Sequence, residues 1–286
     1  MNATVRLRAD TAYQCDSRAA SDIGRTARLD LVFACRRGRT VLAHAYAEPP
    51  FRVGRLLHAG PVAHMILISS GPGIFTGDRL EQRVRVEAGA RVLLTSQAAL
   101  QVHPAAAAAP ASIESSYEIE DDATLDCFWD PVIPFAGARL KQRVDLKIAG
   151  GGEIFWSDGL MSGRVGRGET WAFDGLDHEL RANVAGSLTY LERYDLVPRA
   201  RGVTRPWRAH QANYLGTTIV RSPAATAVRA EEAQRRLRTV DGLQAGVDCL
   251  EPELVVGRVM AGSGPPFVSA RAVLRDAFGR PPLRRT

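Results

Sequence analysis

Apolar and polar residues alternate along most of this chain, and the alternation becomes regular near residue 27. Every second residue of 27–35 is apolar, which is the period of a half-buried strand. A glycine-containing turn follows at 36–39 and a second β-prone run covers 40–46, so this segment predicts a hairpin. Pro49 and Pro50 end the hairpin, because proline has no backbone N–H to donate to a strand ladder.

Further short β-prone runs follow, and almost every gap between them contains glycine, proline, aspartate or asparagine. The predicted strands cover residues 63–69, 80–87, 91–96, 112–120, 124–129, 139–149, 153–157, 178–185 and 187–196. No helical period interrupts these runs, so a layout of alternating strands and helices is disfavoured.

One kind of turn recurs at 86–92, 119–125 and 148–154, with an apolar residue on each side of a tight small or acidic turn. The start positions are 33 and 29 residues apart. Near-regular recurrence favours stacked coils of sheet, although any antiparallel β protein can reuse such a turn.

The pattern changes after residue 197. The run 224–240 carries apolar residues at helical spacing and is followed by Gly242 as a stop signal. A strand at 254–260 and a helix at 266–278 follow, and both helices are expected to pack on the sheet. The expected fold is therefore mainly β, with layered or β-solenoid-like sheets and a few C-terminal helices.

The domain organisation follows from the same pattern. Residues 1–23 lack periodicity and are expected to form a flexible N-terminal tail. Residues 24–286 are expected to form one β-rich domain. The 45% apolar and 24% charged fractions are ordinary for a globular chain that buries a core.

The charge of +6 and the pI of about 9.5 come from dispersed arginines. No recognisable nucleic-acid module accompanies them, so a basic surface for an acidic partner and a mere compositional bias are the open interpretations. No stretch resembles a signal peptide or approaches the roughly 18 apolar residues of a membrane span. Four cysteines lie far apart at 15, 35, 127 and 249 and are expected to be reduced thiols of a cytoplasmic protein.

Two loops could carry chemistry. The glycine-rich segment 69–78 lacks the Gly-Lys-Ser/Thr ending of a phosphate-binding loop. Its glycines instead favour a bent connection, which the Asp78 carboxylate is expected to cap. The polar 95–103, which includes Gln97, could line a channel, but such residues more often satisfy backbone groups at a strand end.

Two later segments are also conspicuous. The aromatic and proline-rich 128–139 is expected to be a buried crossover rather than an exposed partner anchor. The glycine-rich 156–169 carries Asp158, Arg164, Arg167 and Glu169, which predict an internal salt-bridge set or, alternatively, oxygens for a passing cation. The six histidines show no metal-site spacing, and no catalytic arrangement can be assembled, so no enzyme is predicted.

Taken in order, these segments resemble the UreD family of urease accessory proteins, called UreH in some organisms. The resemblance rests on 24–33, 69–78, 95–103, 130–139, 157–169, Glu192-Arg193 and 253–258 with the terminal helix. Similar proteins usually differ at Leu100 and Gln101, in the alanine run 105–109 and at 127–129.

The resemblance implies a non-catalytic scaffold that binds apo-urease and recruits UreF, which in turn carries the nickel-binding GTPase UreG. It further implies that nickel reaches urease through an internal tunnel, with no tightly bound cofactor and only transient nickel in this chain. Weak, dispersed oxygen ligands suit transit, and the lining candidates are Asp78, Gln97, Asp158 and Glu169.

Two other interpretations stay open from the residues. A carbohydrate-binding or carbohydrate-active β-solenoid protein would need carboxylates clustered along one groove. A surface-binding β module without metal involvement would need no such cluster of carboxylates.

Overall fold

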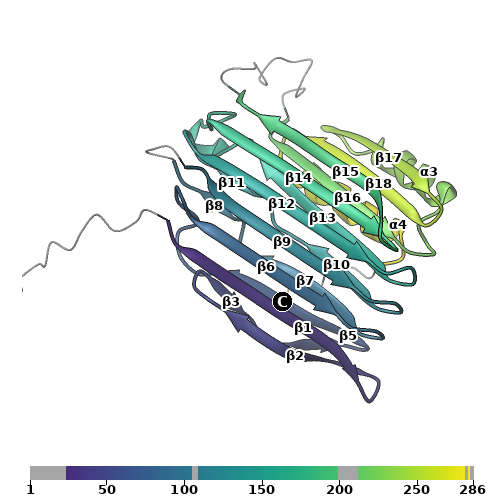
Figure 1. Cartoon of the computed structure of the whole chain (residues 1–286). Coiled ribbons are helices and arrows are strands. Elements are labelled where there is room, and N and C mark those ends of the chain that lie inside the picture. The colour runs from purple at the N-terminus through teal and green to yellow at the C-terminus, as the bar shows by residue number, and fades with distance from the viewer. Residues whose placement is uncertain (1–23, 105–108, 199–211, 281–282, 284–286) are drawn as a thin grey trace, which may run out of the picture.

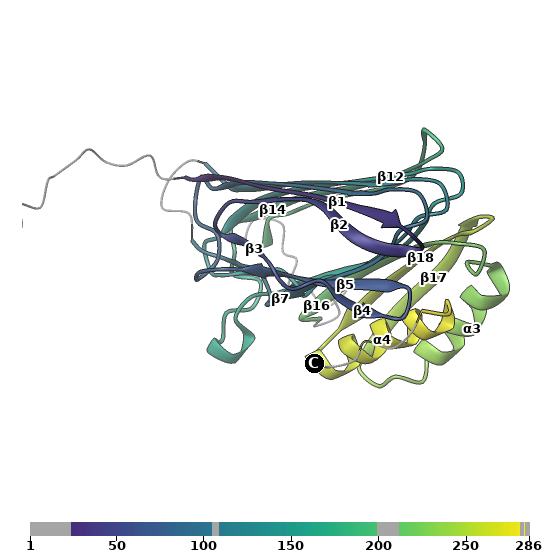
Figure 2. The same ribbon diagram turned by 90° about the horizontal axis from the view of Figure 1, so that it is seen from below.

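The computed structural model describes residues 24–104, 109–198, 212–280 and 283 (Figure 1). The predicted tail over 1–23 lies outside the described residues, and the single-domain assignment stays a prediction. Two sheets lie face to face as layers, with helices on the outer face of the second layer (Figure 2).

The first layer is a seven-stranded sheet in which parallel strands form the centre and antiparallel hairpins form the edges. Its spatial order is β15-β14-β12-β9-β6-β1-β2. The strands are β1 (Thr26–Arg36), β2 (Arg39–Ala47), β6 (Arg79–Val86), β9 (Ala111–Ile119), β12 (Arg139–Ile148), β14 (Gly175–Val184) and β15 (Ser187–Leu196).

The second layer is a nine-stranded sheet with the order β17-β18-β16-β13-β10-β7-β5-β3, and β4 pairs with β5. The strands are β3 (Phe51–Val53), β4 (Leu57–Ala59), β5 (Val62–Ser69), β7 (Arg91–Gln97), β10 (Thr124–Phe128), β13 (Glu153–Met161), β16 (Tyr214–Arg221), β17 (Leu243–Glu251) and β18 (Leu254–Ala261).

The chain winds between the two layers as stacked coils. Each coil runs along a strand of the second sheet, crosses at one end and returns along the first sheet. Two of these crossings contain the short parallel strands β8 (Gln101–Val102) and β11 (Ile133–Pro134), which pair with each other. The mainly β, β-solenoid-like prediction is therefore confirmed.

The recurring turn predicted from the sequence is the tight return at the other end of each coil. Successive turns hydrogen-bond to one another. Glu120 N–H donates to the Val86 carbonyl at 3.0 Å, and Ala149 N–H donates to the Ile119 carbonyl at 2.8 Å. The spacing of about thirty residues is thus the length of one coil.

Several strands differ from the sequence expectation. The hairpin of β1 and β2 is confirmed, but β16 and β17 were not predicted, and neither were the short β3, β4, β8 and β11. In β17 the residues Leu243, Ala245, Val247 and Cys249 pack on a helix and alternate with exposed positions. This is the period of a half-buried strand, so the sequence carried a signal for β17 that the prediction missed. Strand β13 continues past the predicted end at Ser157, which places Asp158 within a strand and not in a loop.

Both predicted helices are present, with narrower bounds for the first and shifted bounds for the second. They are α3 (Ala227–Leu237) and α4 (Gly264–Ala277), and a short 3₁₀ helix, η1, covers Val165–Arg167. Thr226 caps α3, accepting from the Arg229 N–H. None of the described helices is long and apolar enough to cross a membrane.

The apolar stripes of the two helices pack on the outer face of β16, β17 and β18, as expected. The contact cluster includes Ala233 and Leu237 of α3 with Phe267 and Leu274 of α4. Arg271 of α4 adds polar attachment: its Nε donates to Ser157 Oγ at 2.9 Å and its Nη2 to the Trp129 carbonyl at 2.7 Å.

Phe267 lies directly over two glycines of neighbouring strands. A Cβ on Gly216 would stand 2.7 Å from the Phe267 ring, and a Cβ on Gly159 would stand 2.6 Å from it. The absence of side chains at both glycines therefore allows α4 to approach the sheet.

We expect Gly216→Ala to destabilise the fold by about 1–3 kcal/mol, because the added methyl overpacks the contact with Phe267. Urea unfolding followed by circular dichroism measures this change. Gly246→Ala on β17 is the matched control, since a Cβ there meets nothing within 4 Å. Equal midpoints for the two variants would contradict the packing account.

Candidate functional site

A cavity of about 870 Å³ lies between the two sheets. Its lining begins at Phe51 and Leu67 of β3 and β5 and ends at Gln244 and Met260 of β17 and β18. It therefore runs across the stacked coils, perpendicular to the strands, for most of the width of the layers.

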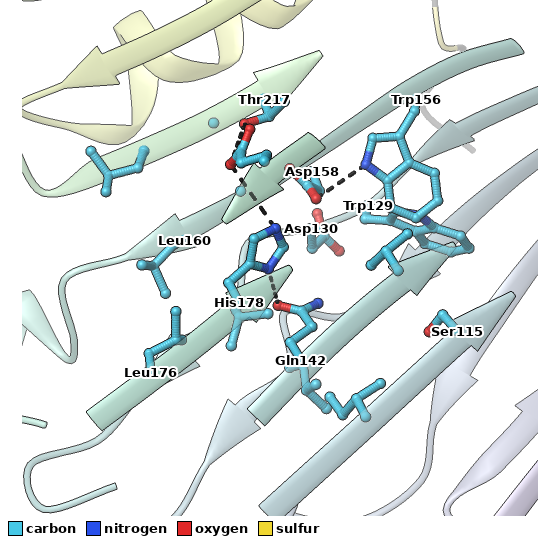
Figure 3. A pocket seen from close by; sticks show the side chains of 18 of the residues that line it. Ser115, Trp129, Asp130, Gln142, Trp156, Asp158, Leu160, Leu176, His178 and Thr217 are labelled. Atoms are coloured by element: carbon cyan, nitrogen blue, oxygen red, sulfur yellow. Dashed lines mark hydrogen bonds and ion pairs between the residues drawn. The ribbon is translucent and has the colours of Figure 1, made fainter. Parts of the chain in front are cut away.

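The wall is largely apolar and includes three tryptophans, Trp129, Trp156 and Trp171. Polar side chains form a band across this apolar wall (Figure 3). We call this band the polar stripe. From the seven-stranded sheet it includes Gln82, Ser115, Gln142, His178 and Glu192, and from the nine-stranded sheet Ser96, Asp158, Thr217 and Arg258.

Strand alternation and register create the polar stripe. Gln142 lies between the buried Leu140 and Val144, so it points inward like its apolar neighbours. The pairing then aligns polar residues of adjacent strands: Gln82 with Ser115, Gln142 with His178, and Asp158 with Thr217.

Glu192 is the most heavily hydrogen-bonded member of the stripe. It is only 5% exposed, and it accepts from Arg258 Nη1 at 2.8 Å, Thr217 Oγ1 at 3.0 Å and Tyr190 O–H at 2.8 Å. Burying a carboxylate is costly, and hydrogen bonds and an ion pair of this kind compensate for the lost contacts with water. Burial and the neighbouring Glu192 carboxylate raise the pKa of Tyr190, so its hydroxyl stays a donor.

His178 faces Glu192 from the adjacent strand. Its Nδ1 lies 3.2 Å from Gln142 Oε1, so with that oxygen as acceptor the proton is on Nδ1. Its Nε2 lies 4.0 Å from Glu192 Oε1, and its ring stacks on Tyr194 with centroids 4.6 Å apart. Burial lowers the pKa of His178 to about 4, so the imidazole is neutral near pH 7.

Asp158 faces the same cavity from β13, between Trp156 and Thr217 (Figure 3). Its Oδ2 accepts from the Trp156 indole N–H at 3.1 Å. Burial raises the pKa of Asp158, and the Trp156 hydrogen bond opposes that shift. Burial also raises the pKa of Asp130, another carboxyl of the cavity wall.

The four residues predicted to line a tunnel lie in different parts of the structure. Asp158 lies on the cavity wall, whereas Gln97 is exposed at the end of β7. Asp78 caps its loop as predicted: it accepts from Phe75 N–H at 2.9 Å and from Arg25 N–H at 3.0 Å. Glu169 accepts from Arg164 Nε at 2.8 Å and lies in the crossing loop. Whether any of the four contacts a passing ion stays a prediction.

Other expectations for the loops have mixed outcomes. The ion pair of Arg164 with Glu169 is confirmed, but the four-residue salt-bridge set is wrong in extent, because Asp158 faces the cavity from β13. The crossover over 128–139 is buried at Phe135, as expected. In 95–103, Ser96 Oγ accepts the Asp130 backbone N–H at 2.8 Å, which agrees with the role of satisfying backbone groups.

Sequence reasoning missed His178, Glu192, Thr217 and Arg258. A weak signal was present, since His178 lies two residues from both Leu176 and Leu180 and therefore on the same face of the strand as these apolar residues. A polar residue at a buried strand position, repeated in several strands, indicates a polar core element. Pairing His178 with Glu192 requires the register, which the sequence does not show.

The stripe has limited capacity for a metal. Across the described ranges, no group of three or more histidine, cysteine, aspartate or glutamate side chains is placed to hold a metal ion. His178 with Glu192 supplies two donors, an imidazole nitrogen and a carboxylate oxygen, which suit weak binding of a first-row divalent ion.

Comparison with known proteins identifies the family. The family model described as UreD urease accessory protein matches residues 25–285. The chain belongs to the UreD family of urease accessory proteins. The expectation drawn from the ordered motifs is confirmed.

Curated relatives agree over most of the chain. The urease accessory protein UreD of Deinococcus radiodurans is 31% identical over 270 residues, covering 91% of this chain and 94% of the relative. That of Cupriavidus pinatubonensis is 30% identical, covering 90% and 92%. That of Lysinibacillus sphaericus is 26% identical, covering 82% and 88%.

Family membership decides the broad role of this UreD-family chain. Its relatives are accessory proteins, so the chain is a urease accessory protein and not a catalytic enzyme. The carbohydrate-active alternative consequently loses its support.

The neutral His178 predicts an acid-dependent stability. Its folded-state pKa of about 4 lies below the ordinary 6.5, so its contribution is complete above pH 6.5 and is lost as pH falls towards 4. Between pH 7.5 and 5 the loss is about 2 kcal/mol. His178→Asn keeps an N–H for Gln142 and should remove this part of the dependence, as urea midpoints at the two pH values would measure. An unchanged pH dependence would contradict a buried, neutral His178.

Proposed function

We propose that this UreD-family chain binds apo-urease and, with UreF and the GTPase UreG, promotes GTP-dependent insertion of nickel into urease in the cytoplasm. Nickel is the cargo of this process, and the chain holds it only transiently. The cavity between the sheets is proposed as the passage that the ion follows.

The observation that carries the proposal is the cavity with its polar stripe. A passage has to replace part of the hydration shell of Ni²⁺ without trapping the ion, so weak and dispersed donors suit it better than a closed site. The stripe offers such donors one after another, from Gln82 and Ser115 through Gln142 to His178 and Glu192.

The ends of the cavity also support a passage. At one end the lining includes the half-exposed Ile68 and Ser69, and at the other it includes the exposed Gln244 and Gly246. An ion that enters beside β5 and leaves beside β17 would cross the whole stack. The two ends would then lie against different partners.

Charge and exposed apolar side chains support partner binding. The net charge of +6 favours acidic partner surfaces. Large apolar side chains are exposed at Leu188 and Leu191 on the edge strand β15 and at Val228 and Val268 on the helices. Exposed groups of this kind are typical of a subunit that functions in an assembly.

The first experiment is co-expression with apo-urease and UreF, purification through a tag on this chain, and urease activity after addition of nickel, GTP and UreG. Co-purification and chain-dependent activation are the expected results. Failure of the folded chain to bind either partner would reject the proposal. Binding without any effect on nickel activation would favour a surface-binding module without metal involvement.

Asp158 is the sequence candidate best placed to test the passage. We expect Asp158→Ala to co-purify with urease and to lower nickel-dependent activation several-fold, because one oxygen donor of the wall is lost. Asp145→Ala is the matched control, since Asp145 lies on β12 beside Lys147 and is absent from the cavity lining.

Gln97→Ala and Glu169→Ala complete the series, whereas Asp78→Ala also removes a loop cap and has to be checked for folding. Normal activation by the Asp158, Gln97 and Glu169 variants, with urease binding intact, would exclude these residues from the passage.

A further inference from the structure

A second cavity lies at the end of the strands where β8 and β11 connect the two layers, which we call the crossing end. This groove has a volume of about 420 Å³, and the loop between β13 and β14 forms one of its sides. Its apolar wall consists of Ile133, Phe135, Met161 and Val165. None of its described lining residues belongs to the cavity between the sheets, so the groove is a separate feature.

The loop that forms the groove is anchored at several points. Gly163 has a φ of +141°, and a Cβ there would stand 2.5 Å from the Glu169 carbonyl oxygen, so glycine allows the two arms of the loop to approach. The Glu169 carboxylate accepts from the Ala136 N–H at 3.2 Å and from Arg164 Nε at 2.8 Å. A surface that is already ordered loses little conformational entropy when a partner binds.

A ladder of stacked rings supports the same loop. The rings of Phe75 and His103 stack with centroids 4.3 Å apart, and His103 meets Phe135 edge-on at 4.9 Å. The guanidinium carbon of Arg164 lies 4.0 Å from the centre of the Phe135 ring. Arginine and aromatic side chains held in this way are prominent among the residues that dominate binding at protein interfaces.

Apolar side chains of this region remain exposed. Phe75 is 40% exposed and Val165 is 36% exposed. The short helix η1 projects from the crossing end and is the teal coil in Figure 2. The described chain therefore leaves the groove open to a partner.

The rim of the groove carries an excess of positive charge. Arg164 is paired with Glu169, whereas Arg167 is exposed and makes no ion pair within the ranges that the structure describes. A guanidinium beside an apolar wall is complementary to a carboxylate that lies next to an apolar side chain.

We propose that the groove is a docking site for a protein partner that places an aliphatic or aromatic side chain against Ile133, Phe135 and Met161 and an adjacent carboxylate on Arg167. The inference rests on the proposed function in that the partner is one of the proteins that this chain is proposed to bind. The groove lies at the ends of the strands, whereas the cavity between the sheets runs across the strands. A partner seated in the groove can therefore be held without covering either end of the passage.

The test uses the tagged full-length chain in biolayer interferometry, with apo-urease and UreF as separate probes. Val165→Asp places a carboxylate where the partner brings its own, and Arg167→Glu reverses the charge of the rim. Both residues are exposed, and urea midpoints equal to that of the unsubstituted chain would show that the variants fold. Each variant should bind the same one of the two probes about tenfold more weakly and the other probe normally.

Conservative and control variants separate docking from a general effect of charge. Arg167→Lys keeps the positive charge and should retain most of the affinity. Arg37→Glu makes the same charge reversal on the exposed turn of the β1–β2 hairpin, at the opposite end of the strands, and should bind both probes normally. Added salt should weaken the unsubstituted chain more than Arg167→Glu, because salt screens the ion pair that the variant lacks.

The outcomes distinguish this inference from the proposed function. If the unsubstituted chain binds both probes and the Val165→Asp and Arg167→Glu variants bind them equally well, the groove is overturned and the proposed function stands. The groove is also overturned if Arg37→Glu loses as much affinity as Arg167→Glu. If the folded unsubstituted chain binds neither probe, the proposed function fails and the groove inference fails with it.

Discussion

Main-chain hydrogen bonding between successive coils is the constraint on which the rest of the structure depends. The parallel pairing of β6, β9, β12 and β14 keeps each coil in register with the one before it. A strand places alternate side chains on opposite faces, so a fixed register also fixes which side chains meet in the interior. The tight turns reinforce the register, because each one hydrogen-bonds to its predecessor.

This constraint explains how a mostly apolar sandwich contains a polar path. Inward positions are mostly apolar, and a polar residue on one strand would be isolated without a polar neighbour on the next. Here Gln142 meets His178 on the adjacent strand, and the Thr217 hydroxyl donates to Glu192 of the opposite sheet, so these polar groups satisfy one another. The same groups face a cavity instead of a closed core.

The second sheet extends beyond the first, and this asymmetry links the cavity to the outside. Strand β15 ends the seven-stranded sheet, whereas β18 and β17 continue the nine-stranded one. Arg258 lies on that extension and reaches inward to Glu192. The helices cover the opposite face of the same strands, held by Phe267 over Gly216 and by Arg271 on Ser157. Arg258 and the helices are therefore attached to the same strands, from opposite faces.

The sequence by itself determined the elements that depend on neighbouring residues. These elements are the hairpin of β1 and β2, the recurring turns, both helices, the Asp78 cap and the Arg164–Glu169 pair. They are local, because the pattern or the partner that defines each one lies within a few residues or one loop. The ordered motifs also indicated the family. The sequence did not show the long extent of β13, where Gly159 interrupts the apolar pattern, and therefore placed Asp158 in a loop.

The tertiary structure alone decided the candidate site. His178, Glu192 and Arg258 come from three strands, and bringing them together depends on register, on the irregular pairing of β14 with β15 and on the pairing of β16 with β18. A shift of one residue would turn each side chain to the other face. The physical reason is that strand pairing is a long-range interaction, so the residues that build the cavity have no local pattern that connects them.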